Sequence, residues 1–233
     1  AAEAEALAVH DAAMEAFQRR GFAGLNSHLP GLRRALERAP ASYPVLEQAG
    51  DTWIVRSNDM ADGLMLAMMA TVAAQGSSPD AQVNVSTQPN VYPMIALLLG
   101  SAAVERHEYR EAITWLDRGL AMQPLDRFVL TERIAALHGL RRWDEALSAA
   151  DAALASGDLL IATHPASLHR KRGFSLVELN RLDEAQAAYE ESLKTEPDNA
   201  AALGELEYIR GLRRGAAPTA VQLIAPGAQP QTN

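Results

Sequence analysis

Three short segments of the sequence share one pattern: Tyr109-Arg110-Glu111-Ala112, Trp143-Asp144-Glu145-Ala146 and Leu182-Asp183-Glu184-Ala185. Each begins with a large apolar residue, continues with two charged residues and ends with alanine at the start of an apolar pattern with helical spacing. The alanines are separated by 34 residues and then by 39. A period of 34 residues is typical of a repeated helix-turn-helix unit. The five extra residues fall within residues 156–165, where turn-forming residues and a proline predict an enlarged loop.

The three copies, residues 93–126, 127–160 and 166–199, resemble the tetratricopeptide repeat (TPR) family. The first copy has Leu99-Gly100 where the family has its Leu-Gly pair, and the second copy departs from the pattern with Arg133-Ile134 there. The family's small-residue and closing-proline positions are filled by Ala112, Gly119, Pro124, Ala146, Ala153, Gly173, Ala185 and Pro197, with Asp158 replacing proline in the second copy. Small residues let two helices cross closely, and proline ends a helix. The resemblance implies an all-α solenoid of helical hairpins.

The sequence predicts three parts. Residues 1–90 form a helical N-terminal region with short strands, residues 91–214 form the TPR solenoid, and residues 215–233 form an extended tail. A solenoid needs a cap with a polar outer face. We expect a capping helix over residues 200–214, with Leu203, Leu206 and Ile209 on its buried face.

The N-terminal part departs from the repeat. Residues 2–20 read as a helix ended by glycine, and residues 24–39 as a second helix closed by proline. Residues 52–56 and 82–86 are β-type segments on either side of a helix expected over residues 58–75. This pattern predicts a small βαβ-like or two-stranded element.

Four methionines, Met60, Met65, Met68 and Met69, occupy the helix expected over residues 58–75. One interpretation is a soft-metal or adaptable hydrophobic binding site, because thioethers are polarisable and flexible. No His or Cys accompanies the cluster. We therefore predict that the methionines form a buried helix face.

The tail is rich in alanine, proline and glutamine but contains an apolar segment, residues 221–225. Its surroundings offer no local way to bury these side chains. We hypothesise that the segment packs in extended form, either in the repeat groove of its own chain or on a second copy. The second alternative predicts a homodimer through the tail.

Composition removes several classes of function. The net charge is −8 without a Lys/Arg block, so nucleic acid and membrane surfaces are not expected partners. The sequence has no cysteine, its six histidines lack zinc-site spacing, and neither a Gly-x-Ser-x-Gly elbow nor a Gly-rich phosphate loop occurs. We therefore expect no metal, no other cofactor and no enzymatic activity. The absence of cysteine fits cytoplasm and periplasm equally well. Abundant arginine and alanine with only two lysines indicate a bacterial source.

The TPR resemblance implies that a ligand lies along the first helix of each repeat. The residues expected to line this groove are Met94, Leu97, Ser101, Val104, Phe128, Thr131, His138, Arg170, Lys171 and Phe174. The groove is apolar at its start and basic near Arg170 and Lys171. Leu97, Ser101 and Glu132 stand where some TPR domains carry the Lys and Asn side chains that bind a C-terminal carboxylate, so chaperone-tail binding of the Hsp70/Hsp90 kind is not expected. Alternatively, the groove residues pack against the N-terminal region.

These patterns predict a bacterial scaffold or adaptor that holds a peptide or a partner helix in the groove. One alternative is a secretion chaperone or an inhibitor of a secreted partner. Another is an accessory or sensor protein whose N-terminal region binds a small molecule. The sequence does not identify the partner.

Overall fold

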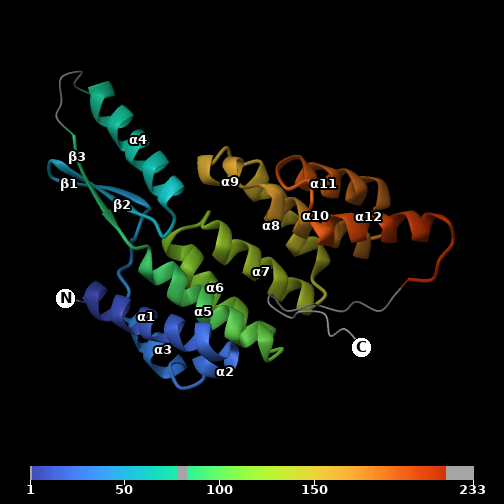
Figure 1. Cartoon of the computed structure of the whole chain (residues 1–233), viewed down its shortest axis with the longest axis horizontal. Coiled ribbons are helices and arrows are strands. Elements are labelled where there is room, and N and C mark those ends of the chain that lie inside the picture. The colour runs from blue at the N-terminus through green and yellow to red at the C-terminus, as the bar shows by residue number, and fades with distance from the viewer. Residues whose placement is uncertain (1, 78–82, 219–233) are drawn as a thin grey trace. The chain divides into compact units, whose positions relative to one another are not determined.

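The computed structural model describes residues 2–77 and 83–218. Within these residues the chain forms twelve helices and one three-stranded sheet (Figure 1). Contacts group the chain into two compact units, Ala1–Leu99 with Trp115–Val129 and Gly100–Thr114 with Leu130 onward. Helices α5, Val91–Glu105, and α6, Tyr109–Met122, contribute residues to both units. The contact grouping therefore divides the first predicted repeat, and a domain boundary near residue 90 stays a prediction.

Three helices begin the first unit: α1 spans Ala2–Arg20, α2 spans Phe22–Leu25 and α3 spans Leu29–Glu37. As predicted, α1 ends at Gly21, whose φ of 58° suits a residue without a side chain. The prediction of one helix over residues 24–39 was wrong, because the chain breaks between α2 and α3. Both short helices pack against α1 (Figure 1).

The sheet of the first unit has the order β1-β2-β3, with β1 at Leu46–Ala49, β2 at Thr52–Arg56 and β3 at Asn84–Gln88. β2 and β3 are parallel and are joined by α4, Met60–Ser77, so the βαβ interpretation is confirmed. Strand β1, which pairs antiparallel with β2, was not predicted. The sequence feature that indicates this hairpin is the two-residue turn Gly50-Asp51, where Gly50 has a φ of 65°.

The apolar residues of α4 lie on two sides of the helix. Leu66 and Ala70 are buried, and the helix packs on β2 and β3. Met60 is 89% exposed, Met68 62% and Met69 41%. The prediction that the methionines form a buried face was therefore wrong for these three, because the small sheet covers only one side of α4.

Three helical hairpins follow the repeated sequence pattern: α5 with α6, α7 (Arg127–Gly139) with α8 (Trp143–Leu154), and α10 (Ala166–Glu178) with α11 (Leu182–Thr195). The turn in each hairpin contains one non-glycine residue with positive φ, two positions before the next helix. These residues are His107, Arg141 and Asn180, with φ of 59°, 58° and 58°. These three residues are separated by the same intervals as the repeated alanines.

The same backbone hydrogen bond closes each of these turns. The N–H three residues past the last helical residue donates to a carbonyl five residues earlier, as in a Schellman motif. The bonds are Glu108 to Ala103 at 2.8 Å, Arg142 to Leu137 at 2.9 Å and Arg181 to Leu176 at 2.8 Å. The repeat therefore extends from the sequence to the backbone geometry.

The small residues of the pattern lie where helices cross. Ala112, Ala146 and Ala185 are all fully buried. A side chain at Gly173 would place its Cβ 2.8 Å from the ring of Tyr189, which is too close for ordinary contact. The prediction that small residues allow close helix packing is confirmed at these positions.

Two details of the second unit differ from prediction. The expected loop of residues 156–165 contains a short helix, α9 (Leu159–Thr163), whose first turn is capped by Asp158 through a 2.9 Å hydrogen bond from Ile161 N. The capping helix is present as α12, Ala200–Arg213, beside α11 (Figure 1). However, Leu203 is 46% exposed, because Ala202 and Ile209 provide the buried face instead.

Residues 221–225, the apolar segment of the tail, lie outside the described residues, so their packing stays a prediction. None of the helices that the structure describes has the length and hydropathy needed to cross a membrane.

Candidate functional site

The ten residues predicted to line the groove lie on α5, α7 and α10, the first helices of the three hairpins. Met94, Leu97 and Phe128 belong to the first unit, and Phe128 is 47% exposed. The other seven belong to the second unit, namely Ser101, Val104, Thr131, His138, Arg170, Lys171 and Phe174. The candidate site consists of these seven residues of the second unit and their neighbours.

A polar trio connects the first helices of the second unit. Ser101 on α5 forms a hydrogen bond to the carboxylate of Glu132 on α7, and Lys171 on α10 interacts electrostatically with the same carboxylate. Glu132 is only 9% exposed, and Lys171 is partly buried. Three helices therefore contribute one polar side chain each to a site that is mostly closed to water.

Burial shifts both ionisable groups of the trio toward their neutral forms. Burial raises the pKa of the Glu132 carboxyl, while Ser101 and Lys171 act in the opposite direction. Burial likewise lowers the pKa of the Lys171 ammonium, and Glu132 opposes that shift. The two groups therefore stabilise each other's charged forms.

Glu132 has unused hydrogen-bonding capacity. Its buried Oε1 has no hydrogen-bond partner among the described residues. A buried acceptor without a donor costs stability, and native proteins rarely retain one without a reason. Glu132 Oε1 therefore keeps an unused acceptor position, enclosed by protein, beside the donors of the Lys171 ammonium.

His138 belongs to the core of the second unit and not to a ligand surface. It is 3% exposed, and its ring centroid lies 5.7 Å from that of Trp143 and 4.7 Å from that of Phe174. Its Nε2 lies 2.8 Å from Ser175 Oγ, and the Ser175 hydroxyl donates to the Lys171 carbonyl. Because a hydroxyl has one hydrogen, His138 Nε2 donates to Ser175. The prediction that His138 lines the groove is corrected.

We expect His138 to make the stability of the second unit depend on pH. Burial, with a further contribution from Lys171, lowers the pKa of His138 to about 3. The unfolded state, with a pKa near 6.5, therefore binds more protons than the folded state between these values, and stability falls as pH falls through that window. The free energy of unfolding should decrease by about 2 kcal/mol from pH 7 to pH 5 through this group.

Urea unfolding of the wild type and of His138→Gln at several pH values checks this expectation. Glutamine keeps a donor toward Ser175 but does not titrate, so the variant should show a shallower pH dependence. A matched His164→Gln variant at an exposed position should behave like the wild type. Equal pH dependence in His138→Gln and the wild type would contradict the assignment.

Carboxylates offset most of the positive charge at the basic end of the predicted groove. Arg170 Nη1 lies 2.6 Å from Glu196 Oε2, and the Arg170 side chain is 22% exposed. Lys171 interacts with Glu132. The positive charge of Arg170 and of Lys171 is therefore offset by a nearby carboxylate in each case, and the role of these two residues in a groove stays a prediction.

Sequence reasoning identified Glu132 only as a departure from the carboxylate-binding pattern. The structure makes it the residue that joins Ser101 and Lys171. The sequence could have indicated that these residues are neighbours, because Ser101, Glu132 and Lys171 lie on the first helices of successive repeats. Their burial was not available from the repeat pattern, since it depends on how the helices stack.

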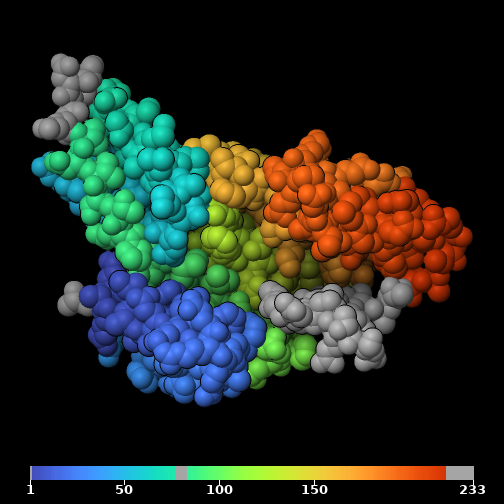
Figure 2. Space-filling view, in the orientation of Figure 1, coloured from blue at the N-terminus to red at the C-terminus, as the bar shows by residue number. Residues whose placement is uncertain are grey.

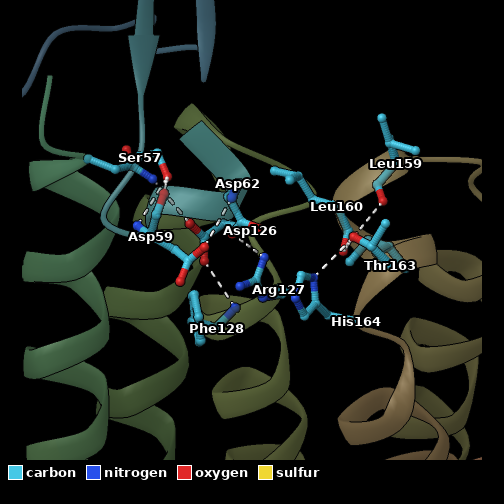
Figure 3. A network of polar contacts seen from close by, with 12 residues as sticks. Ser57, Asp59, Asp62, Asp126, Arg127, Phe128, Leu159, Leu160, Thr163 and His164 are labelled. Carbon is cyan, nitrogen blue, oxygen red and sulfur yellow. Dashed lines mark hydrogen bonds and ion pairs between the residues drawn. The ribbon is translucent and has the colours of Figure 1, made fainter. Parts of the chain in front are cut away.

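A second polar cluster belongs to the first unit (Figure 3). Arg127 Nη1 lies 2.5 Å from Asp62 Oδ2, and Asp59 Oδ1 accepts from the N–H of Asp62 at 3.0 Å. Asp126 accepts from two N–H groups at the start of α7, and burial raises the pKa of this carboxyl while those bonds lower it. The acids of this cluster cap helices and pair with Arg127. Within residues 2–77 and 83–218, no group of His, Cys, Asp and Glu has an arrangement suited to a metal ion.

An open depression between α1 and α3 has a volume of about 380 Å³. Its lining is mainly apolar and includes Val9, Ala12 and Pro30, with Glu5 and Arg34 as charged members. If the N-terminal region binds a small molecule, this depression is where we expect it to bind. That alternative stays a prediction.

No protein-family model and no curated protein matches the sequence. Among solved structures, the MamA RS-1 ArsTM double mutant is similar over 91% of this chain and 85% of that chain, with 13% identity and a TM-score of 0.54. The first TPR of Spaghetti (RPAP3) bound to HSP90 peptide SRMEEVD is 25% identical, covering 53% of this chain and 94% of that one, with a TM-score of 0.47. The Sgt2 TPR domain from Aspergillus fumigatus is 23% identical, covering 60% and 93%, with a TM-score of 0.49.

The repeated hairpins, their shared turn geometry and their buried small residues give the chain a TPR-like fold. The class is an all-α helical solenoid, to which the first unit adds one small sheet.

Proposed function

We propose that this chain is a protein-interaction adaptor that binds a peptide or a partner helix along α5, α7 and α10. The observation that supports it best is the trio of Ser101, Glu132 and Lys171, in which a buried carboxylate oxygen lacks a hydrogen-bond partner among the described residues. The proposal includes no catalytic step and no cofactor. We infer a bacterial source from the arginine-rich composition.

The chemistry of the trio suits a peptide backbone. Each peptide group offers one N–H donor and one C=O acceptor. When the side chains that enclose it move aside, Glu132 Oε1 can accept from the N–H, and the Lys171 ammonium can donate to the carbonyl. Both protein groups are already largely desolvated, so a bound amide forms strong hydrogen bonds without removing much further water.

Apolar contacts beside the trio would add affinity. Val104 and Phe174 lie three residues from Ser101 and Lys171 on the same helices, and Thr131 precedes Glu132. All three are partly buried and so retain exposed surface. We infer that they contact the side chains of the bound segment while the trio holds its backbone.

Selection of peptides from a display library on the intact chain, followed by calorimetric titration of a selected peptide, tests this function. Glu132→Gln and Lys171→Met should each weaken binding by about tenfold, or about 1.4 kcal/mol, because each removes a charge-assisted hydrogen bond. Glu190→Gln, at an exposed position on α11, is the matched control and should bind like the wild type.

Circular dichroism at the titration temperature must show that each variant remains folded. Unchanged affinity in both Glu132→Gln and Lys171→Met would place the binding site elsewhere. Failure to select any peptide that binds the wild type would contradict the adaptor proposal itself.

A further inference from the structure

The outer face of α4 has an unusual composition for a surface helix. Nine of its described residues between positions 60 and 76 are exposed, and none of them is charged. They are Met60, Ala61, Leu64, Met68, Met69, Val72, Ala73, Gln75 and Gly76. We call this set the α4 face, and Figure 2 shows α4 at the surface beside β3.

Helix α11 of the same chain provides a comparison. Its exposed residues are Asp183, Glu184, Ala187, Glu190, Glu191, Lys194 and Thr195, and five of these seven are charged. That composition is usual for a helix with one side in water. The α4 face therefore differs from a surface that the same chain leaves in solvent, which indicates that another apolar surface covers it.

Rotating α4 to bury the α4 face would break the contacts that the other side of the helix makes. Leu66 and Ala70 are buried on the other side, against the sheet. Asp62, the one charged residue of α4, is 5% exposed and pairs with Arg127. These contacts hold the α4 face outward.

The side chains of the face are arranged as a ridge. Met60, Leu64, Met68 and Val72 recur every four residues and are 89%, 65%, 62% and 70% exposed. Ridges with this spacing on two helices interdigitate at about −50°, which is the commonest class of helix packing in globular proteins. Two copies of α4 would supply two identical ridges. The ridge of one copy therefore has the same spacing as the ridge of the other.

Charge restricts contact between two copies to an uncharged surface. Each chain has a net charge of −8, so two copies repel each other over most of their surface. The uncharged face lets them approach without placing like charges in contact. An anionic membrane is disfavoured, because α4 contains no Lys or Arg to attract it.

The size of the face fits a modest interface. Its four ridge side chains are 62% to 89% exposed, and interfaces smaller than the standard of about 800 Å² per partner are typical of weak association. Val85 on β3, a strand that α4 packs against, is a further exposed apolar residue at 38%. The face is thus large enough to support reversible association.

We propose that the chain forms a homodimer through the α4 face, independently of the groove function. In a twofold arrangement a residue i of one copy contacts j of the other, and j contacts i. The ridge places the axis between Leu64 and Met68, so Leu64 of one copy packs against Met68 of the other. Met60 then lies toward Val72 of the other copy.

Sedimentation equilibrium of the intact chain over a concentration series tests the dimer. The wild type should change from the monomer mass to twice that mass as concentration rises. Leu64→Glu should raise the dissociation constant at least about a hundredfold, because it buries charge in an apolar interface and opposes like charges across the axis. Ala187→Glu adds the same charge at an exposed position on α11 and should associate like the wild type.

The absence of cysteine from the chain permits a second, independent test of the geometry. An oxidised mixture of Leu64→Cys and Met68→Cys chains should form mixed disulfide dimers faster than a mixture of Leu64→Cys and Met60→Cys chains. Equal rates would overturn the proposed register. This test does not depend on introducing a charge that could affect folding.

Several outcomes would overturn the proposal. A wild-type chain that stays monomeric at all concentrations would do so, as would a Leu64→Glu chain that dimerises normally. Loss of the dimer on deleting residues 216–233, with Leu64→Glu unaffected, would assign the interface to the tail instead. Loss of the dimer in Ala187→Glu as well would show a general charge effect and not a specific face.

Discussion

Arg127→Met should lower the free energy of unfolding by about 3 to 5 kcal/mol, because it leaves a buried carboxylate without its cation. Arg127 and Asp62 are separated by 65 residues in sequence but by 2.5 Å between Nη1 and Oδ2. Their side chains are 14% and 8% exposed, so little water is available to replace the lost partner. Urea unfolding at neutral pH measures the change.

Two further variants separate the effect of the unpaired charge from the loss of packing. In Asp62→Leu with Arg127→Met, no charge remains buried, so stability should recover by more than half of the single-variant loss. Arg110→Met, at an exposed position on α6, should change stability by less than about 0.5 kcal/mol. A single Arg127→Met variant as stable as the wild type would show that the pair contributes nothing.

Tyr189→Ala should destabilise the second unit by a similar amount, about 3 to 5 kcal/mol, because it empties a packed aromatic site. Tyr189 is 2% exposed and belongs to a core cluster with Leu176, Ala185 and Ile209. Its ring lies against Gly173, where no side chain fills the space. Thermal and urea unfolding of the variant, with the exposed Glu190→Ala as control, measure the loss.

A double-mutant cycle connects this prediction to the small-residue pattern. Gly173→Leu alone should be destabilising, since its Cβ would lie 2.8 Å from the Tyr189 ring. Combined with Tyr189→Ala, the new leucine has space, so the two effects should sum to more than the measured double-variant loss. Simple additivity would mean that the two positions do not share a crossing.

The polar trio and the α4 face illustrate two ways in which function can oppose stability. A buried carboxylate oxygen without a donor is unfavourable in the unliganded chain. Exposed methionine and leucine side chains on α4 are also unfavourable in water. In both proposals a partner removes the cost, which explains why such features would be retained in a folded protein.

The candidate site could be predicted in part. The 34-residue period placed Ser101, Thr131, Arg170 and Lys171 on the first helices, where the structure has them. It could not show that His138 is buried, because a helix position faces a ligand or a neighbouring helix according to the stacking angle. Nor could it show that Glu196 compensates Arg170, since Arg170 lies on α10 and Glu196 follows the end of α11.

The sequence by itself determined the repeat, the helical hairpins and their close crossings. These depend on local spacing, on small residues and on turns that recur at the same interval, all of which can be read along the chain. The tertiary structure alone decided which side of α4 is covered, which partner Asp62 has and that Glu132 meets Ser101 and Lys171. Periodicity identifies the faces of a helix, but only the packed neighbours decide whether each face meets protein or water.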